Sequence, residues 1–236
     1  MRGVEPLDVN AWNARLEPLA PEERLRFAVE TFGDGLLFTS SFGAGSGVLL
    51  HMWSRVAREL PVVFIDTGFL FEETITYRDQ LVAELGLELQ VVRPDVARAE
   101  FLAQHGDDVM KRDPDFCCAQ NKVAPLAPLL ANARAWVSGL RRDQSDTRAS
   151  TPVLLATEDG PMKVHPLVTM SAADVVRYMT EHGIPDHPLR ARRYLSIGCI
   201  PCTRAVADGE SERAGRWAGT MKTECGLHTH LRTRAS

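Results

Sequence analysis

The apolar run Gly35-Leu-Leu-Phe-Thr-Ser40 leads directly into the glycine-rich turn Ser41-Phe-Gly-Ala-Gly-Ser-Gly47. A short run of this kind is typical of a buried strand. We expect a helix from about Val48 to Arg58 to follow the turn. A buried strand, a tight turn and a helix in this order predict the first unit of an α/β fold.

The same order of strand, loop and helix recurs along the chain. Pro61-Val-Val-Phe-Ile65 predicts a second buried strand, which precedes Asp66-Thr-Gly68 and a helix. Apolar strands joined by helices predict a parallel twisted sheet covered by helices on both faces, so the fold class is α/β. The remaining elements are expected as a helix over residues 72–85, a strand over 87–92, a helix over 96–104 and a strand over 135–138.

Helix signals also flank this series. Helices are expected over residues 8–16 and 21–33, and Ser171-Ala-Ala-Asp174 resembles a capping box for a helix that reaches His182. From Asp186 onward the periodicity fades. We therefore expect one domain over residues 1–236, with a core of about 20–205 and a loop-rich tail of about 206–236.

Composition and charge argue against several classes of function. Its 236 residues carry a formal net charge of −4, which argues against a protein that coats duplex nucleic acid with a basic face. No apolar run approaches the ~18 residues of a membrane span, and the first residues lack the apolar stretch of a secretory signal. We expect a cytoplasmic protein that binds neither nucleic acid nor membrane. A monomer and a homo-oligomer are both compatible with these numbers.

The loops after Ser40 and Ile65 are the first places to look for a ligand. Parallel sheets bind ligands at the carboxyl ends of their strands, and the N–H groups and hydroxyls of residues 40–47 suit a phosphate. The turn matches neither a Walker A loop nor the three-glycine dinucleotide fingerprint. Asp66, directly after the second strand, would bind ribose hydroxyls or magnesium, or cap the next helix.

Arginines follow the fourth expected strand. The segment Gly139–Arg148 carries Arg141, Arg142 and Arg148, whose guanidinium groups suit phosphate or sulfate oxygens. The plainer alternative is a solvated arginine loop. Of the chain's basic residues 23 are arginine and only 4 are lysine, so an arginine cluster alone is weak support for an anion site.

The cysteines are the sharpest signal in the sequence. They occur as Cys117-Cys118, Cys199-Ile-Pro-Cys202 and a single Cys225. In a cytosolic chain, close pairs favour metal or redox chemistry over structural disulfides. Four thiolates in two pairs can surround one zinc or one iron–sulfur cluster, and a redox disulfide or unrelated buried thiols also remain open. The adjacent pair converges only on a helical or kinked backbone.

Cys225 is left over from the two pairs. It lies near the end of the chain among cationic residues, which favour the nucleophilic thiolate. An ordinary thiol in a frayed tail is the plainer alternative. A nucleophile on a mobile tail would suit a ping-pong reaction, because the tail can close over bound substrate and later present the thiol to a protein reductant.

Taken together, these motifs resemble those of the assimilatory adenylyl-sulfate reductases. This group is the iron–sulfur branch of the adenylyl-sulfate and 3′-phosphoadenylyl-sulfate reductase family. The resemblance covers about residues 39–228, and its most specific motif is Lys222-Thr-Glu-Cys-Gly-Leu-His228. The other matching segments are Phe64–Thr74, Ala135–Arg142, Ser196–Cys202 and Gly215–Trp217.

The resemblance implies a fold of the adenine-nucleotide α-hydrolase type and thioredoxin as a partner. It implies that the Cys225 thiolate attacks the sulfur of adenylyl sulfate, so that AMP leaves and a thiosulfonate forms. Thioredoxin then releases sulfite. It also implies a [4Fe-4S] cluster with four cysteine ligands, which would be Cys117, Cys118, Cys199 and Cys202.

Cations must offset the repulsion between a thiolate and a dianionic substrate. By matching position, the resemblance assigns this role to Lys122, Arg148, Arg213 and Arg216, and it places Ser40, Ser41 and Gly43 near the nucleotide. The expected substrate-binding residues are completed by Asp66, Arg141, Arg142 and His228.

Two departures from the family pattern matter. Asn121 stands where the family usually has arginine, next to the retained Lys122. The turn at Ser40 also lacks the Ser-Gly-Gly-x-Asp-Ser pattern of ATP pyrophosphatases, which counts against the rival hypothesis of a tRNA sulfur-transfer enzyme. The nearest alternative is reduction of the 3′-phosphorylated substrate or of both nucleotides. A zinc-binding module without catalysis is the alternative from another class.

Overall fold

The computed structural model describes residues 8–227 and contains a six-stranded sheet. The strand order is β3-β2-β1-β4-β6-β5, and every neighbouring pair is parallel except β5 and β6. The expected α/β class and parallel sheet are confirmed, whereas β5 and β6 were not anticipated. The strands are β1 (Leu36–Thr39), β2 (Val62–Ile65), β3 (Leu89–Val92), β4 (Ala135–Val137), β5 (Leu154–Leu155) and β6 (Met162–Val164).

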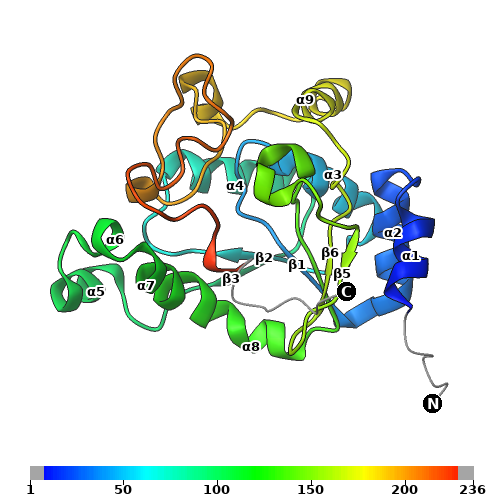
Figure 1. Ribbon diagram of the computed structural model, residues 1–236, viewed down its shortest axis with the longest axis horizontal. Coiled ribbons are helices and arrows are strands. Elements are labelled where there is room, and N and C mark those ends of the chain that lie inside the picture. Colours follow the sequence, from blue (N-terminus) through cyan, green and yellow to red (C-terminus); the bar gives the residue numbers. More distant parts are fainter. Residues whose placement is uncertain (1–7, 228–236) are drawn as a thin grey trace.

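Helices cover both faces of this sheet. Figure 1 shows α3 and α4 on one side of the strands and α7 and α8 on the other. The described α-helices are α1 (Val9–Leu16), α2 (Pro21–Phe32), α3 (Ser46–Val56), α4 (Glu72–Leu85), α5 (Arg98–His105), α6 (Val109–Arg112), α7 (Pro114–Cys118), α8 (Ala124–Asn132) and α9 (Ala172–Glu181). Among them, none is long and apolar enough to cross a membrane.

Alternation along the central strands divides the core into two layers. On one face, Phe38 and Phe64 belong to the large cluster that includes the buried residues of α3. On the other face, Leu37 and Trp136 pack with Leu126 of α8. Leu126 is fully buried, so truncation to alanine would cost about 2–5 kcal/mol of stability.

Helix termini follow the sequence signals. Ser171 and Asp174 form the expected capping box at α9: the Ser171 hydroxyl accepts from the Asp174 N–H at 3.1 Å, and the Asp174 carboxylate accepts from the Ser171 N–H at 2.9 Å. Gly86 ends α4 in the left-handed conformation at φ 60°, which glycine adopts without steric cost. Local capping therefore fixes the lengths of the elements around the sheet.

The chain reverses its direction of strand addition at β1. β2 and β3 are added on one side of β1, and β4 and β6 on the other. In such sheets the carboxyl ends of the two strands at the reversal leave a crevice that binds ligands. Short 3₁₀ turns over residues 188–192 and 200–202 follow α9, and Figure 1 shows the remaining C-terminal segment alongside this end of the sheet.

Candidate active site

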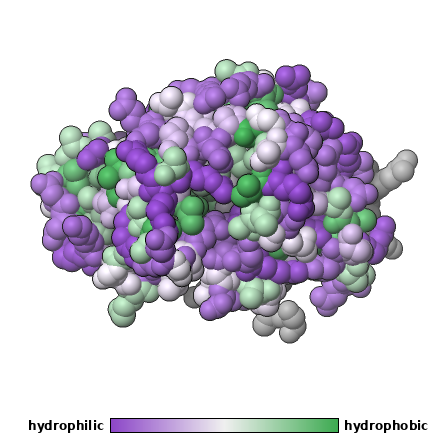
Figure 2. Space-filling view, turned by 90° about the horizontal axis from the view of Figure 1, so that it is seen from above, coloured by the Kyte–Doolittle hydropathy of each residue, from purple (hydrophilic) through white to green (hydrophobic). Residues whose placement is uncertain are grey.

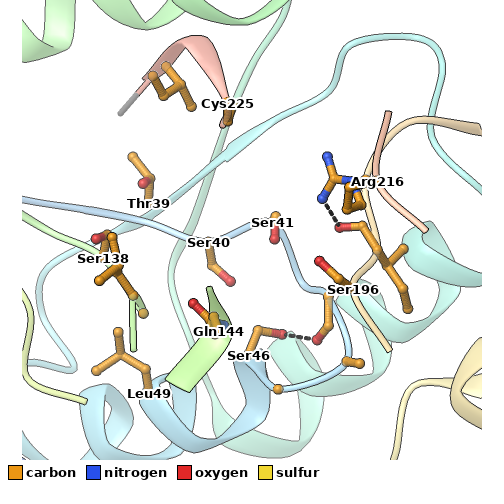
Figure 3. Close-up of a pocket in the computed structure, with 18 of the residues that line it drawn as sticks. Thr39, Ser40, Ser41, Ser46, Leu49, Ser138, Gln144, Ser196, Arg216 and Cys225 are labelled. Carbon is orange, nitrogen blue, oxygen red and sulfur yellow. Dashed lines mark hydrogen bonds between the residues drawn. The ribbon is translucent and has the colours of Figure 1, made fainter. Parts of the chain in front are cut away.

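The turn after β1 forms the floor of a pocket. The Ser40 hydroxyl accepts a hydrogen bond from the Phe42 N–H at 3.1 Å, and the Ser46 hydroxyl donates to the Gly43 carbonyl at 2.7 Å. Phe42 adopts φ 48° and is fully buried, and its ring meets that of Phe64 edge to face at 5.6 Å. This anchor holds the turn so that Ser40, Ser41 and Gly43 line the pocket (Figure 3).

The opposite wall comes from the end of β4. Ser138 and Gly139 follow this strand and line the same pocket as the β1 turn. The pocket therefore lies at the carboxyl ends of β1 and β4, where the strand order reverses. Figure 3 shows Ser40, Ser138 and Gln144 near one another below Cys225.

The described lining of the pocket carries a surplus of positive charge. Glu212 is its single acidic side chain, and that carboxylate is paired with Arg141 at 2.9 Å. A cavity with this charge balance attracts an anion. The five cations that line it are Lys122, Arg141, Arg148, Arg213 and Arg216.

Two of these arginines show the effects of burial and of neighbouring charge. Burial, followed by repulsion from Arg148, lowers the pKa of Arg213 to about 10. The Nε atom of Arg216 is buried without a hydrogen-bond partner among the described residues, while its Nη1 donates to the Ile197 carbonyl at 3.3 Å. The guanidinium also stacks over Trp217 at 4.4 Å. An oxyanion in the pocket would satisfy both the spare donor and the excess charge.

Cys225 lines the pocket from the C-terminal segment. Lys222, three residues earlier, forms an ion pair with Asp115 of α7. Glu224 forms an ion pair with Arg148 at 2.6 Å. Contact with the Cys225 thiol, together with burial, raises the pKa of Cys118. The leftover cysteine therefore lies between the cationic pocket and the nearer cysteine pair.

The four paired cysteines line a second, smaller cavity next to the first. The expected helical backbone at Cys117 and Cys118 is confirmed, because α7 ends at this pair and continues as one π-helical turn over residues 119–123. Such turns often mark functional sites. Burial and the neighbouring Cys199 and Cys202 raise the pKa of Cys117 to about 11 and outweigh the opposing effects of Asn121 and Lys122.

Neutral donors and one cation surround these sulfurs. The Thr67 hydroxyl lies 3.3 Å from the Cys199 Sγ. The Asn121 Nδ2 donates to the Cys117 carbonyl at 3.1 Å and lies 3.7 Å from the Cys117 Sγ. Lys122 lines both cavities. Burial opposes its charge, but the attraction of Cys199 and then Cys225 outweighs burial and raises the pKa of Lys122.

Comparison with known proteins identifies the family of this chain. The model of the phosphoadenosine phosphosulfate reductase domain matches residues 35–205, which include the strands, the glycine turn and both cysteine pairs. The chain belongs to this reductase family. The expected family membership is therefore confirmed.

Individual members of the reductase family match most of the chain. An adenosine 5′-phosphosulfate reductase of Streptomyces coelicolor is 48% identical over 214 residues, which are 90% of each chain. A phosphoadenosine 5′-phosphosulfate reductase of Gloeobacter violaceus is 41% identical over 96% of this chain and 95% of its own. The phosphoadenylyl-sulfate reductase of Candida auris, solved with phosphate, has a TM-score of 0.73 and 29% identity, covering 86% of this chain and 98% of its own.

Two expected substrate contacts of this reductase family member lie elsewhere. Asp66 is outside the pocket lining, accepts from the Gly68 N–H at 3.1 Å and pairs with Arg93. Arg142 is also outside the lining and pairs with Glu17. Their role in binding substrate stays a prediction. His228 lies outside the described residues.

Sequence analysis missed several lining residues. Ser138 bears the same relation to β4 as Ser40 does to β1, and that position was a usable signal. Gln144 lies in a short 3₁₀ turn and Ser196 in a loop. Both fell within segments that the sequence marked, but neither was singled out as a lining residue. Trp217 was noted only as part of a motif, although its ring lies under Arg216 in the candidate site.

Proposed function

We propose that this chain reduces adenylyl sulfate to sulfite and AMP, with thioredoxin as the electron donor. The supporting observation is the joint placement of Cys225 and five cations in one pocket at the reversal of the sheet. Several relatives at 40–48% identity carry the name adenosine 5′-phosphosulfate reductase. The reaction would serve sulfate assimilation and cysteine biosynthesis.

The pocket suggests how the nucleotide binds. We expect its adenosine part to lie along the turn at Ser40 and Ser41, where hydroxyls and backbone groups are available. The phosphosulfate group would lie toward Arg213 and Arg216, because the Arg216 Nε lacks a partner among the described residues. Lys122, between this region and the cysteine cavity, would neutralise charge on the leaving phosphate.

The proposed chemistry takes place at one sulfur. The Cys225 thiolate forms an S–S bond with the sulfur of the sulfate group, and the S–O bond to phosphate breaks as AMP leaves with the electron pair. A thioredoxin thiolate then attacks the Cys225 Sγ, and sulfite leaves with the electron pair of the S–S bond. The second thioredoxin thiol resolves the mixed disulfide. The dithiol supplies the two electrons.

The second cavity fits a cluster better than a single metal ion. Among its described lining residues, the Cys, His, Asp and Glu side chains are four cysteines, the usual ligands of iron–sulfur clusters. Yet within residues 8–227 no three Cys, His, Asp or Glu side chains are grouped closely enough to hold one metal ion. The separation between the cysteine side chains counts against one tetrahedral zinc, which needs all of its ligands around one ion. It suits a [4Fe-4S] cluster better, because each thiolate would bind a different iron.

We propose that Cys117, Cys118, Cys199 and Cys202 hold a [4Fe-4S] cluster. Its contribution would be to join the α7 end to the Cys199–Cys202 turn beside the pocket and to add charge near Lys122. Cytoplasmic location is proposed with it, since the five cysteines, all of them described, form no disulfide and thioredoxin works in a reducing compartment. We further propose one domain, with the Cys225 segment as its closing tail.

Two variants test which cysteine is the nucleophile and which cysteines are cluster ligands. Cys225→Ser should remain folded and brown but form no sulfite. Cys202→Ser should lose iron and visible absorbance. Sulfite formation by Cys225→Ser would disprove the assignment of the nucleophile, and an unchanged spectrum of Cys202→Ser would disprove that ligand.

A dual-substrate or 3′-phosphoadenylyl-sulfate reductase is the second candidate, because relatives with that name also match most of the chain. Turnover of both nucleotides with reduced thioredoxin separates the two. We expect a higher kcat/KM for the unphosphorylated nucleotide, and a preference for the 3′-phosphorylated one would reverse the assignment.

A further inference from the structure

The carboxylate of Glu224 is already bound to two of the arginines that line the cationic pocket, Arg148 and Arg213. Its two oxygens accept from Arg148, from Nε at 2.8 Å and from Nη2 at 2.6 Å. Arg213 donates to the same carboxylate at 3.3 Å. This planar, two-pronged geometry is the one with which a guanidinium binds two oxygens of a phosphate or sulfate.

The contact is largely removed from solvent. The Arg148 side chain is 8% exposed and that of Glu224 is 13% exposed. Arg148 is fixed further by Gln144, whose side-chain oxygen accepts from its Nη1. Charged pairs in such surroundings are screened little by salt. The carboxylate therefore competes effectively with any free anion for these two arginines.

We propose that Glu224 is an internal competitor of the substrate, and that the phosphosulfate group displaces its carboxylate from Arg148 and Arg213 on binding. The inference rests on the proposed function, which places the phosphosulfate group at Arg213, one of these two guanidinium groups, and extends that contact to Arg148. Glu224 is adjacent to Cys225, so the exchange couples substrate binding to a rearrangement of the nucleophile's segment.

Other contacts keep Cys225 near the pocket when the Glu224 carboxylate leaves the two arginines. Lys222 forms an ion pair with Asp115 of α7, and this ion pair involves neither Arg148 nor Arg213. On the other side of Cys225, a side chain on Gly226 would lie within 3.4 Å of Val123 and 3.6 Å of Cys118. The backbone of the segment thus packs closely against the helix that bears the cysteine pair. Release of the Glu224 carboxylate thus removes one anchor of the segment, so its backbone amides open more often while Cys225 stays near the pocket.

Hydrogen exchange tests the displacement without any reaction. Inorganic sulfate, added to the iron-loaded protein under anaerobic conditions, should raise deuterium uptake in the peptide spanning residues 221–227. Glu224→Gln should show the raised uptake without sulfate and no further change with it. Glu210→Gln is the matched control, since Glu210 lies in the same C-terminal segment but pairs with Arg204 outside the pocket. It should respond to sulfate as the wild type does.

Kinetics provide a second readout that a merely structural role would not give. If Glu224 holds the arginines in about 90% of the free enzyme, its neutralisation lowers KM for adenylyl sulfate about tenfold, with kcat within about twofold. An unchanged or raised KM in Glu224→Gln overturns the proposal. So does sulfate that fails to raise wild-type uptake. Failure of the proposed function looks different: no variant forms sulfite, while the exchange response to sulfate persists.

Discussion

Gly198 controls the position of Arg216. A Cβ atom on Gly198 would lie 2.6 Å from the Cζ of the Arg216 guanidinium, and still closer to Nη2. Real Cβ atoms do not approach other heavy atoms so closely. Gly198 does not adopt a positive φ, so alanine is compatible with its backbone. Gly198→Ala therefore displaces the guanidinium while leaving the loop conformation in place.

The size of the effect follows from the contact that is lost. In the proposed complex Arg216 donates a charge-assisted hydrogen bond to the phosphosulfate group, worth about 1.5–3 kcal/mol. Its loss corresponds to a decrease in kcat/KM of roughly 10- to 150-fold, at about 1.4 kcal/mol per factor of ten. The free energy of unfolding should change by less than the roughly 1.5–3 kcal/mol lost from substrate binding, because the guanidinium moves toward open space in the pocket.

The assay is sulfite formation from adenylyl sulfate with reduced thioredoxin, together with iron content. Iron must stay at the wild-type level, since Gly198 precedes the proposed ligand Cys199. A double-mutant cycle supplies the control. In an Arg216→Ala background, Gly198→Ala should have almost no further effect, because the group through which it acts is gone.

Two results would refute this reasoning. If Gly198→Ala keeps the wild-type kcat/KM, the guanidinium position is irrelevant to substrate. If the two substitutions are additive, the alanine acts through something other than Arg216, and the assignment of Arg216 as a substrate contact loses its support.

Three further predictions concern the surroundings of the site. Asn121→Leu removes the amide that donates to Cys117, so iron loss to a chelator should be about tenfold faster; equal bleaching rates of variant and wild type would contradict a role in holding the cluster. Arg213 has a pKa lowered to about 10, and its cationic form binds the anion, so KM for adenylyl sulfate should rise as pH increases from about 9 to 10. A KM that stays flat over that range would argue against its contact with substrate. His187 is buried, and burial lowers its pKa from 6.5 to about 4, so the unfolded state binds more protons and stability is lost as pH falls from 6.5 toward 4. The loss from this group approaches about 3 kcal/mol, and urea unfolding of wild type and His187→Gln at pH 7 and 4.5 should show a smaller decrease for the variant; equal decreases would contradict it.

Local patterns in the sequence were sufficient for the elements that build the pocket floor. Apolar runs identified β1, β2 and β4, because a strand buried on both faces has to be apolar throughout. β3 was also expected, although this edge strand is only partly buried and contains Gln90. The rule that parallel sheets bind ligands at the carboxyl ends of their strands placed Ser40 at the site, whereas the strand order itself was not predicted. The convergence of Cys117 and Cys118 on a helical backbone was also accessible, because adjacent residues on a regular strand point apart.

Side-chain direction was not accessible from the sequence. Arg141 and Arg142 are neighbours of the same type, yet Arg141 lines the pocket and Arg142 turns away to Glu17. The partners that decide this lie more than 65 residues away in the chain. Glu224 was missed for a related reason: its importance comes from Arg148, 76 residues earlier. β5 and β6 are only two and three residues long, too short for periodicity to mark them.

The most direct measurement is mass spectrometry of the protein after one turnover with adenylyl sulfate in the absence of thioredoxin. The account predicts one added SO₃ group on the peptide that contains Cys225, and its release as sulfite when reduced thioredoxin is supplied. An adduct on Cys117, Cys118, Cys199 or Cys202, or AMP release without any covalent adduct, would contradict it.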